Sequence, residues 1–336
     1  GNSYYYNAKY EDAAEVYKLL IEKYDTVVSA DYLFRYAQSL KTLGKYDASE
    51  EVITRFSQMV QNSGLERVLD ADYLSKIEEN SGRYDIKQFP FNSKYSDFAP
   101  AYYKEGLIFS SDRDTGNLAR YRHTWNAKDF LDLYVTSDVD STNTEVKKVA
   151  GDVNTRFHES TSIVTKDGST MFFTRNNFLD GKKYKDAKGT TRLKIYTATL
   201  SEEGEWEDIT ELPFNSDDYS VAHPMLCPDE KVLYFVSDMP GTLGESDIFK
   251  VQIVGDGTYG SPVNLGNTIN TEARETFPFI TQEDVLYFSS DGHPGLGGLD
   301  VFATKIAFDE YDQPIVNVGR PINTKYDDFS FIIDAD

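Results

Sequence analysis

The sequence contains little of what builds disulfides, membrane spans or nucleic-acid surfaces. Its single cysteine, Cys227, excludes a disulfide within the chain. No run of about 18 apolar residues is present, so no transmembrane helix is predicted. Only 34 Lys and Arg residues stand against 56 Asp and Glu residues, and the net charge of -22 would repel the phosphates of a nucleic acid. We therefore expect no nucleic-acid partner.

Residues suited to catalysis or metal binding are also few. The four histidines, His123, His158, His223 and His293, show none of the spacings of a metal site. No Ser-His-Asp order, no nucleophile elbow and no Gly-x-Gly-x-x-Gly after a strand is present. The first residues, GNSYYYNAKYED, hold no apolar signal region, so the chain is either cytoplasmic or has lost a signal.

Residues 1–80 carry the periodicity of helices. Ala8-Lys9-Tyr10-Glu11 is echoed 36 residues later by Gly44-Lys45-Tyr46-Asp47, close to the 34-residue period of tetratricopeptide (TPR) repeats. Apolar residues at helical spacing on both sides of Leu43-Gly44 predict a helix hairpin. Two such repeats are too few to stand alone, so we expect this TPR-like region to pack on the neighbouring domain or to be a remnant of a longer array.

From residue 84 to residue 336 the pattern changes to short strands separated by Asp, Asn and Gly. The tetrad Val-Leu-Tyr-Phe occurs at 232–235 and again at 285–288, and related apolar strands occur earlier. Each group of four strands ends in a junction with an asparagine, and these asparagines are Asn92, Asn154, Asn215, Asn270 and Asn323. Four antiparallel strands in each repeat of about 50 residues predict an all-β propeller after the helices, an α+β multidomain chain overall.

Five junctions predict five blades. We expect residues 84–92 to supply the outermost strand of the last blade, because propellers commonly close by mixing strands from both ends. After Asn323 only one further strand, DFSFIID, is present. The last blade is therefore expected to be incomplete, as if the sequence ended inside a longer protein.

The glycine-rich loops of the last two repeats resemble phosphate-binding loops. SSDGHPGLGGLDVF at 289–302 has a twin, VSDMPGTLGESDIF, at 236–249. Both join strands, whereas a phosphate loop opens a helix. We interpret the glycines as turn residues and the aspartates as caps of loop amides. A calcium ion bound by the loop is the alternative, and no other cofactor is expected.

Two further groups are candidate site residues. Carboxylates at the entry to the innermost strands are expected to ring the mouth of the central channel, where they cap turns, bind a cation or act as in a propeller glycosidase: Asp97, Glu159, Glu275 and Asp327. The insertions at 113–129 and 177–192 hold nine Lys or Arg against four Asp. They predict a partner-binding surface, with solvated loops as the alternative: Arg113, Arg120, Tyr121, Arg122, His123, Trp125, Lys182, Lys183 and Lys185.

Helices followed by blades of the pattern YFSSD–PG–GG–D(I/V)(F/Y) resemble the periplasmic OmpA-family proteins with TPR-like helices and WD40-like (TolB-like) propeller repeats. The resemblance implies a periplasmic, outer-membrane-associated scaffold, not an enzyme. Such a scaffold would bind outer-membrane or envelope proteins and couple a type IX secretion or gliding complex to the cell wall. Peptidoglycan binding in that family belongs to a following domain that this sequence does not contain. The alternatives are a five-bladed glycan hydrolase and a periplasmic sensor that binds a small ligand in the channel.

Overall fold

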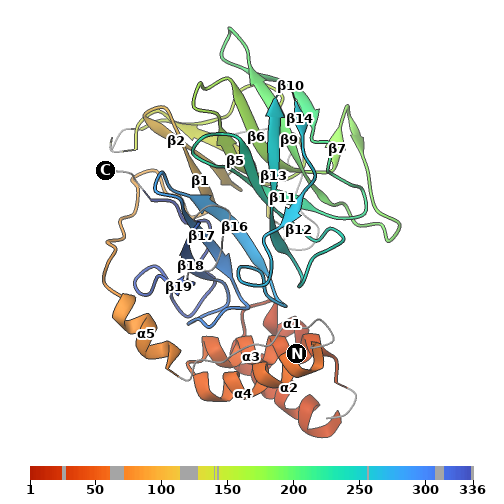
Figure 1. The fold of residues 1–336 in the computed structure, drawn as a ribbon, viewed down its shortest axis with the longest axis vertical. Helices are drawn as coiled ribbons and strands as arrows, with labels where there is room; N and C mark the ends of the chain where they lie inside the picture. Colours follow the sequence, from red (N-terminus) through yellow and green to blue (C-terminus); the bar gives the residue numbers. More distant parts are fainter. Residues whose placement is uncertain are drawn as a thin grey trace.

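The computed structural model describes residues 1–24, 28–60, 72–113, 128–139, 141, 144–255, 257–306 and 314–333. Small antiparallel sheets are arranged around an axis as in a β-propeller, and helices lie at one end of them (Figure 1). The propeller-like arrangement predicted from the repeats is therefore confirmed. None of the helices in the described ranges is long and apolar enough to cross a membrane.

The helices are α1 (Asn2–Tyr5), α2 (Tyr10–Tyr24), α3 (Ala30–Thr42), α4 (Tyr46–Val60) and α5 (Tyr73–Asn80). The predicted hairpin is formed by α3 and α4, and Gly44 turns the chain between them with a φ of +71° that favours glycine. A TPR array is not shown, because α5 leaves the other helices and packs on blade four instead. There the backbone N–H of Arg320 donates to Ser81 Oγ at 2.9 Å.

The other helices dock on the same blade. Ala273, in the loop before the innermost strand of blade four, is buried in one apolar cluster with Leu33, Ile53 and Phe56. Two hydrogen bonds flank this contact. Gln38 Nε2 donates to the carbonyl of Asp291 at 3.0 Å, and Ser57 Oγ donates to a Glu272 carboxylate oxygen at 2.7 Å.

Three blades have four antiparallel strands and blade three has five, and along each sheet the order of the strands follows the sequence. Blade one consists of β1 (Asp97–Tyr103), β2 (Gly106–Ser111), β3 (Asp132–Thr136) and β4 (Val146–Lys148). Blade two consists of β5 (Glu159–Val164), β6 (Thr170–Asn176), β9 (Leu193–Leu200) and β10 (Trp206–Glu211). A hairpin of β7 (Phe178–Leu179) and β8 (Lys182–Lys183) extends from blade two.

Blade three consists of β11 (Val221–Leu226), β12 (Val232–Ser237), β13 (Asp247–Gly255) and β15 (Val263–Asn264), with β14 (Thr258–Tyr259) also paired to β13. Blade four consists of β16 (Glu275–Ile280), β17 (Val285–Ser290), β18 (Asp300–Lys305) and β19 (Val316–Asn317). The second strands are apolar on both faces because each sheet is covered on both sides. Phe235, for example, stacks on Phe214 and on Phe249, with ring centroids 4.8 and 5.9 Å apart.

The junction asparagines explain why the repeat is visible in the sequence. Asn270 is fully buried, and its side-chain amide binds both the backbone N–H and the carbonyl of one residue, as a neighbouring strand would. Its Oδ1 accepts from the N–H of Ile248 at 2.8 Å, and its Nδ2 donates to the carbonyl of Ile248 at 3.0 Å. Asn323 bridges Val301 in the same way. Each such asparagine therefore fastens a junction to the third strand of its own blade.

The prediction of five blades is wrong, because the described residues form a ring of four. Residues 84–92 contain no strand, and neither do the described residues after Asn323. Among the described residues, the fifth junction is followed by the segment 324–333, which pairs with no second strand. Ser330 Oγ accepts from the N–H of Ala99 at 3.1 Å, and Phe329 packs on both Phe98 and Phe277. This last segment thus lies between the innermost strands of blade four and blade one.

Candidate functional site

Five residues around the propeller axis have left-handed backbone conformations at equivalent positions. They are Ala99, Thr161, His223, Phe277 and Ser330, with φ values of +53°, +24°, +56°, +50° and +55°. In the four blades, each lies at an irregularity in the pairing of the first and second strands. A positive φ at Thr or Phe is strained, and such residues concentrate at functional sites. At each bulge, the direction of one side chain changes relative to that in a regular strand.

These residues surround an axial cavity with a volume of about 100 Å³. It is lined by the equivalent stretches 99–102, 161–163, 223–225, 277–279 and 330–332. Alanine, proline, isoleucine, methionine and phenylalanine predominate among them. The cavity is therefore mostly apolar, with polar groups at only a few points.

His223 is the main polar side chain of the axial cavity. Its Nδ1 lies 3.1 Å from Thr161 Oγ1, which is 2.7 Å from Thr174 Oγ1, and the N–H of His223 donates to Thr174 Oγ1 at 2.9 Å. The ring packs on Phe277 with centroids 4.0 Å apart. Burial lowers the pKa of His223 to about 3, so the imidazole is neutral at pH 7.

Two polar atoms of the axial cavity are left without partners. No described residue hydrogen-bonds Nε2 of His223, and Ser162 Oγ is buried without a partner among the described residues. Buried polar atoms are normally paired, so the exception at Ser162 Oγ marks a place where a ligand or a water can bind. His223 is half-buried, and its Nε2 is a second polar atom available at this cavity.

A wider hollow, the turn-side vestibule, adjoins the axial cavity and shares Tyr102, Ile163 and Met225 with it. Its volume is about 470 Å³, and it is lined by the turns between first and second strands of blades one to three together with residues of blade four. Charged side chains lie on this rim, among them Lys104, Lys166, Asp167 and Glu230. Glu230 Oε1 accepts from the N–H of Lys166 at 2.6 Å, which links two blades.

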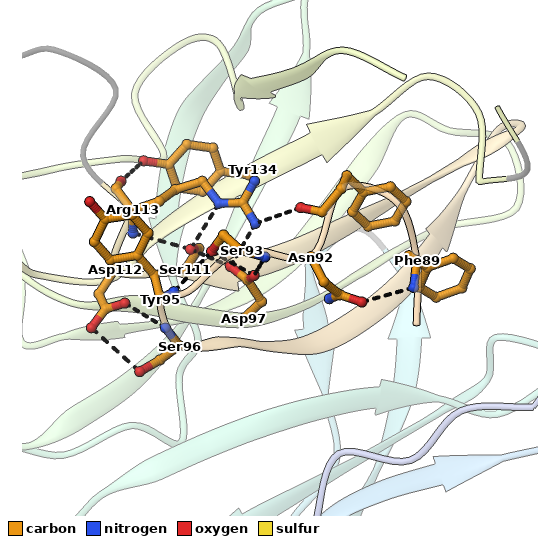
Figure 2. A network of polar contacts seen from close by, with 11 residues as sticks. Phe89, Asn92, Ser93, Tyr95, Ser96, Asp97, Ser111, Asp112, Arg113 and Tyr134 are labelled. Atoms are coloured by element: carbon orange, nitrogen blue, oxygen red, sulfur yellow. Dashed lines mark hydrogen bonds and ion pairs between the residues drawn. The ribbon is translucent and has the colours of Figure 1, made fainter. Parts of the chain in front are cut away.

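The predicted ring of carboxylates lies inside the junction loops and not on an open channel. Figure 2 shows Asp97, which accepts hydrogen bonds from Ser93 and Ser111 and forms an ion pair with Arg113 at 2.7 Å. These hydrogen bonds lower the pKa of Asp97 against the opposing effect of its burial. Arg113 also stacks on Phe109, and the Tyr134 hydroxyl donates to its carbonyl.

Glu159 and Glu275 repeat this pattern with complete burial. Glu275 accepts from the N–H and the hydroxyl of Thr271, both at 2.7 Å, and from Ser290 Oγ at 2.6 Å. Glu159 accepts in the same way from Thr155. Burial raises the pKa of each carboxyl to about 8.

The fourth predicted carboxylate, Asp327, is not the equivalent residue. The junction position belongs to Asp328, which accepts from the N–H of Thr324 at 2.6 Å, whereas Asp327 accepts from the N–H of Leu299. The sequence contained the signal for Asp328, because each junction asparagine precedes its carboxylate by five residues, as Asn270 precedes Glu275 and Asn323 precedes Asp328.

The glycine-rich loops are held by their own aspartates. Asp300 accepts from the N–H groups of Leu296 and Gly297 at 3.0 and 2.9 Å, and Asp247 does the same with Leu243 and Gly244. Across the described residues, no three His, Cys, Asp or Glu side chains gather closely enough to hold a metal ion.

The predicted partner-binding residues are only partly brought together. Lys182 and Lys183 lie on β8, and Lys185 follows them. Arg113 is removed from this surface by its buried ion pair with Asp97. Five of the predicted residues lie outside the described residues: Arg120, Tyr121, Arg122, His123 and Trp125.

Sequence reasoning missed Arg156, which joins these lysines. Its guanidinium and Lys183 Nζ both lie over the ring of Phe157, 5.4 and 4.6 Å from the centroid. Burial first, and then the nearby charges of Lys185 and Arg156, lower the pKa of Lys183. The signal was available in the sequence, since Arg156 and Phe157 stand in the junction directly before β5.

No family model and no curated protein matches this chain. Similar solved structures include an α-L-arabinofuranosidase from Lactobacillus brevis, at 12% identity over 65% of this chain and 70% of that chain, with a TM-score of 0.43. A thermostable family-43 glycoside hydrolase is 17% identical over 70% of this chain and 76% of that chain, with a TM-score of 0.41. A puromycin-hydrolyzing peptidase from Mycobacterium tuberculosis is 12% identical over 69% and 48%, with a TM-score of 0.32.

These comparisons correct two expectations, the non-catalytic adaptor of an outer-membrane complex and the absence of enzymatic activity. Both depended on the family resemblance, which no family model bears out. Of the similar structures named above, the first two are glycosidases, which correspond to the glycan hydrolase among the alternatives left open by the sequence, and the third is a peptidase. With identities under 25% and TM-scores under 0.5, the activity of this chain has to be argued from its own residues.

Proposed function

We propose that the axial cavity binds the neutral, apolar end of a small organic ligand. The observation that carries this proposal is the ring of five strained residues, which surrounds an apolar cavity with one neutral imidazole. Binding sites are typically apolar hollows with a few well-placed polar groups.

The size of the axial cavity limits the group that enters it. An apolar protein cavity of about 150 Å³ accommodates benzene, and the axial cavity has about 100 Å³. One aromatic ring or a short branched alkyl group matches this space once side chains such as Met225 adjust. The flexible thioether of Met225 is well suited to such adjustment.

The protonation state of His223 selects a neutral group. With a pKa of about 3, the imidazole carries no charge that would compensate an anion at pH 7. Nε2 and Ser162 Oγ are instead available to hydrogen-bond a hydroxyl or an amide. The rest of the ligand would occupy the turn-side vestibule, where its polar atoms meet charged side chains and water.

Three single-ring probes test this proposal by ligand-observed NMR. We expect p-cresol, which has a ring and a hydroxyl, to bind more tightly than toluene, and the cation benzamidine not to bind. His223→Phe should reduce the difference between p-cresol and toluene, and Ala101→Leu should block both by filling the cavity. Val254→Ala, at an exposed position of β13, is the matched control. Equal binding of all three probes, or no effect of either cavity variant, would contradict the proposal.

A second candidate function is glycan hydrolysis in the turn-side vestibule. Glycoside hydrolases use two carboxyl groups that flank the bond to be cleaved, and Asp167 and Glu230 both line this hollow. Asp167 accepts hydrogen bonds from Thr165 and Ser169, which lower its pKa and keep it ionised, as a nucleophile or base requires. Tyr102, with 42% of its surface exposed, offers a ring for stacking on a sugar.

Hydrolysis is tested with arabinan and with aryl glycosides as substrates. Release of reducing sugar that is lost in both Asp167→Asn and Glu230→Gln would support this second function. Glu283→Gln, an exposed carboxylate of blade four, is the control. Activity that persists in both vestibule variants would place the reaction elsewhere or show a contaminant.

The basic surface formed by Arg156, Lys182, Lys183 and Lys185 is proposed as a site for an acidic partner, such as an envelope protein. Within the described part of the chain, none of these four side chains has a carboxylate within ion-pair distance. Concentrated charge of one sign against an acidic background orients an acidic partner.

A periplasmic location, expected from the resemblance alone, stays a prediction that cell fractionation tests.

A further inference from the structure

We propose that the turn-side vestibule continues into a second hollow on blade one, and that the two hollows together bind a chain of neutral sugars. The second hollow, the side groove, has a volume of about 320 Å³ and is lined by residues 103–105 and 135–137 and by Glu145 and Lys147. This inference rests on the glycan function proposed for the vestibule, and it adds the length and the charge of the ligand.

The two hollows meet at the end of β1. Tyr103 and Lys104 line both of them, and the preceding residue, Tyr102, lines both the vestibule and the axial cavity. Three consecutive residues therefore connect the axis of the propeller with the outer part of blade one. A path of this shape suits a ligand that extends in one direction, which a single small ring does not.

The side groove has a rigid floor. Gly106 lies so close to the end of β3 that an added Cβ would collide with the carbonyl oxygen of Thr136. The N–H of Leu107 donates to Thr136 Oγ1 at 2.9 Å, and Tyr103 packs on Trp206 of blade two with ring centroids 6.2 Å apart. Because these contacts form the groove before a ligand binds, the entropic cost of binding is lowered.

The charges of the two hollows nearly cancel, although the whole chain has a net charge of -22. Three lysines stand against four carboxylates, and Lys147 Nζ is paired with Glu145 at 2.8 Å. An anionic chain would meet the carboxylates and a cationic chain the lysines, so a neutral chain is favoured. Both kinds of group hydrogen-bond hydroxyls. The seven residues are Lys104, Lys147, Lys166, Glu105, Glu145, Asp167 and Glu230.

Tyrosine rings follow the same path. Tyr102 is 42% exposed, and Tyr103 is half-buried with Lys104 Nζ 4.9 Å from its ring centroid. A tyrosine offers an apolar face and a polar hydroxyl, which match the C–H face and the hydroxyl groups of a sugar ring. A cavity of about 150 Å³ holds benzene, and on that scale the vestibule and the side groove have room for about four sugar rings.

The rim favours a sugar chain over a peptide. The N–H groups of Thr165, Cys227 and Thr281 donate to carbonyls within their own turns at 2.9, 2.9 and 3.0 Å. These turns of blades two, three and four are thus closed on themselves. Extended peptides bind by adding a strand to a free sheet edge, whereas a sugar chain is recognised by the rings and polar side chains that line the two hollows.

The test measures affinity against chain length by isothermal titration calorimetry, with linear oligosaccharides of arabinose, xylose and glucose of two to six units. For at least one sugar, we expect the dissociation constant to fall at least about tenfold from two units to four and then to level off, since two further ring contacts account for such a factor. Tetragalacturonate, which carries four carboxylates, should bind at least about tenfold more weakly than the neutral tetrasaccharide. If the unchanged protein cleaves the sugars, Asp167→Asn replaces it in the measurement.

Two tryptophan variants locate the effect. Ser137→Trp fills the side groove from an exposed position and should reduce the affinity for the tetrasaccharide to that for the disaccharide, while disaccharide binding stays unchanged. Ser261→Trp, at an exposed serine of blade three outside both hollows, is the matched control.

The outcomes separate this proposal from hydrolysis itself. Length-dependent binding without cleavage would support the side groove and reject the second function. Cleavage with no dependence of binding on length would retain that function and overturn the side groove. Equal effects of the two tryptophan variants would also overturn it, as would binding of peptides from a casein digest when none of the sugars binds.

Discussion

The junctions and the axial cavity lie only a few residues apart on the same innermost strands. The polar groups of the junctions are hydrogen-bonded within the protein, whereas two of those at the cavity have no partner among the described residues. At the junction of blade four, Glu275 and Asn270 are fully buried, and each makes at least three hydrogen bonds within the protein. At the axial cavity, Nε2 of His223 and Oγ of Ser162 have no partner among the described residues. Groups of the first kind hold the fold, and groups of the second kind are open to a ligand.

The largest effect is expected where the junction is broken. Asn270→Ala removes an amide that binds both backbone groups of Ile248 and also Asn264. Because buried backbone groups would be left unpaired, the free energy of unfolding should fall by about 3 kcal/mol. Urea denaturation measures this loss.

Asn92→Ala is the matched control for the junction variant. Asn92 is exposed, and its side chain accepts one hydrogen bond, from the N–H of Phe89 at 2.9 Å. The loss should stay below about 1 kcal/mol. Equal losses at the two positions would show that the buried amide bridge is not what fastens a junction.

A pH titration sharpens the comparison, because the junction acids are buried without a cation to balance them fully. The pKa values of Glu159 and Glu275 are raised to about 8, above the value near 4.3 of an unfolded chain. The folded state therefore holds more protons between these values, and stability is lost as the pH rises toward 8. Between pH 6.5 and 8.5 the free energy of unfolding should fall by about 1–2 kcal/mol for each Glu.

Glu275→Gln provides the control for this titration, because a neutral isostere should remove about half of the slope. Thermal unfolding at fixed ionic strength measures it. His223 acts in the opposite sense below pH 6.5, since its lowered pKa makes stability fall as the unfolded state takes up a proton. A flat profile from pH 6.5 to 8.5 in the unchanged protein would contradict the raised pKa values.

The sequence predicts the junctions better than the cavity, and the reason is physical. Junction residues bind within their own repeat, so Thr271 and Glu275 recur at a fixed spacing that can be read directly. The cavity depends on contacts between blades, such as that of His223 with Thr161, 62 residues earlier. Its strained conformations also leave no mark in composition, since Ala, Thr, His, Phe and Ser all occupy the same position.

The number of junctions also overestimated the number of blades. A junction motif reports one innermost segment, whereas a blade needs three more strands to form a sheet. Among the described residues, Asp328 and Ser330 satisfy the motif without those strands, so the fifth junction is present and a fifth blade is not. The helix hairpin was predicted correctly because its apolar periodicity is local, but α5 departs from it through tertiary contacts with Gly319 and Arg320.

A smaller effect on the free energy of unfolding, and one of opposite sign, is expected for a variant of Ala99 at the propeller axis. Ala99 has a φ of +53°, a conformation that costs an alanine about 1 kcal/mol and a glycine almost nothing. Ala99→Gly should therefore raise the free energy of unfolding by about 0.5 kcal/mol, and Ala101→Gly, on the same strand, should lower it by about 1 kcal/mol. Denaturation of the two variants side by side checks this, and a loss at Ala99 equal to that at Ala101 would argue against strain at the axis.

The smallest effect on stability is expected at Lys182 and Lys183 of the basic surface, which lie on the hairpin of β7 and β8 outside the four blades. Lys182 is exposed on β8, and Lys183 has its pKa lowered by burial and by its cationic neighbours, so replacing both removes repulsion instead of an ion pair. Lys182→Glu with Lys183→Glu should change the free energy of unfolding by less than about 0.5 kcal/mol.

The same variant should weaken binding of poly-L-glutamate and reduce the dependence of this binding on salt, because fewer opposite charges are brought together. Lys231→Glu with Lys325→Glu, at two exposed lysines outside this surface, makes the same change in net charge and is the control. If this control weakens binding as much as the change at Lys182 and Lys183 does, the interaction follows the overall charge of the chain and the surface around Arg156 is not its site.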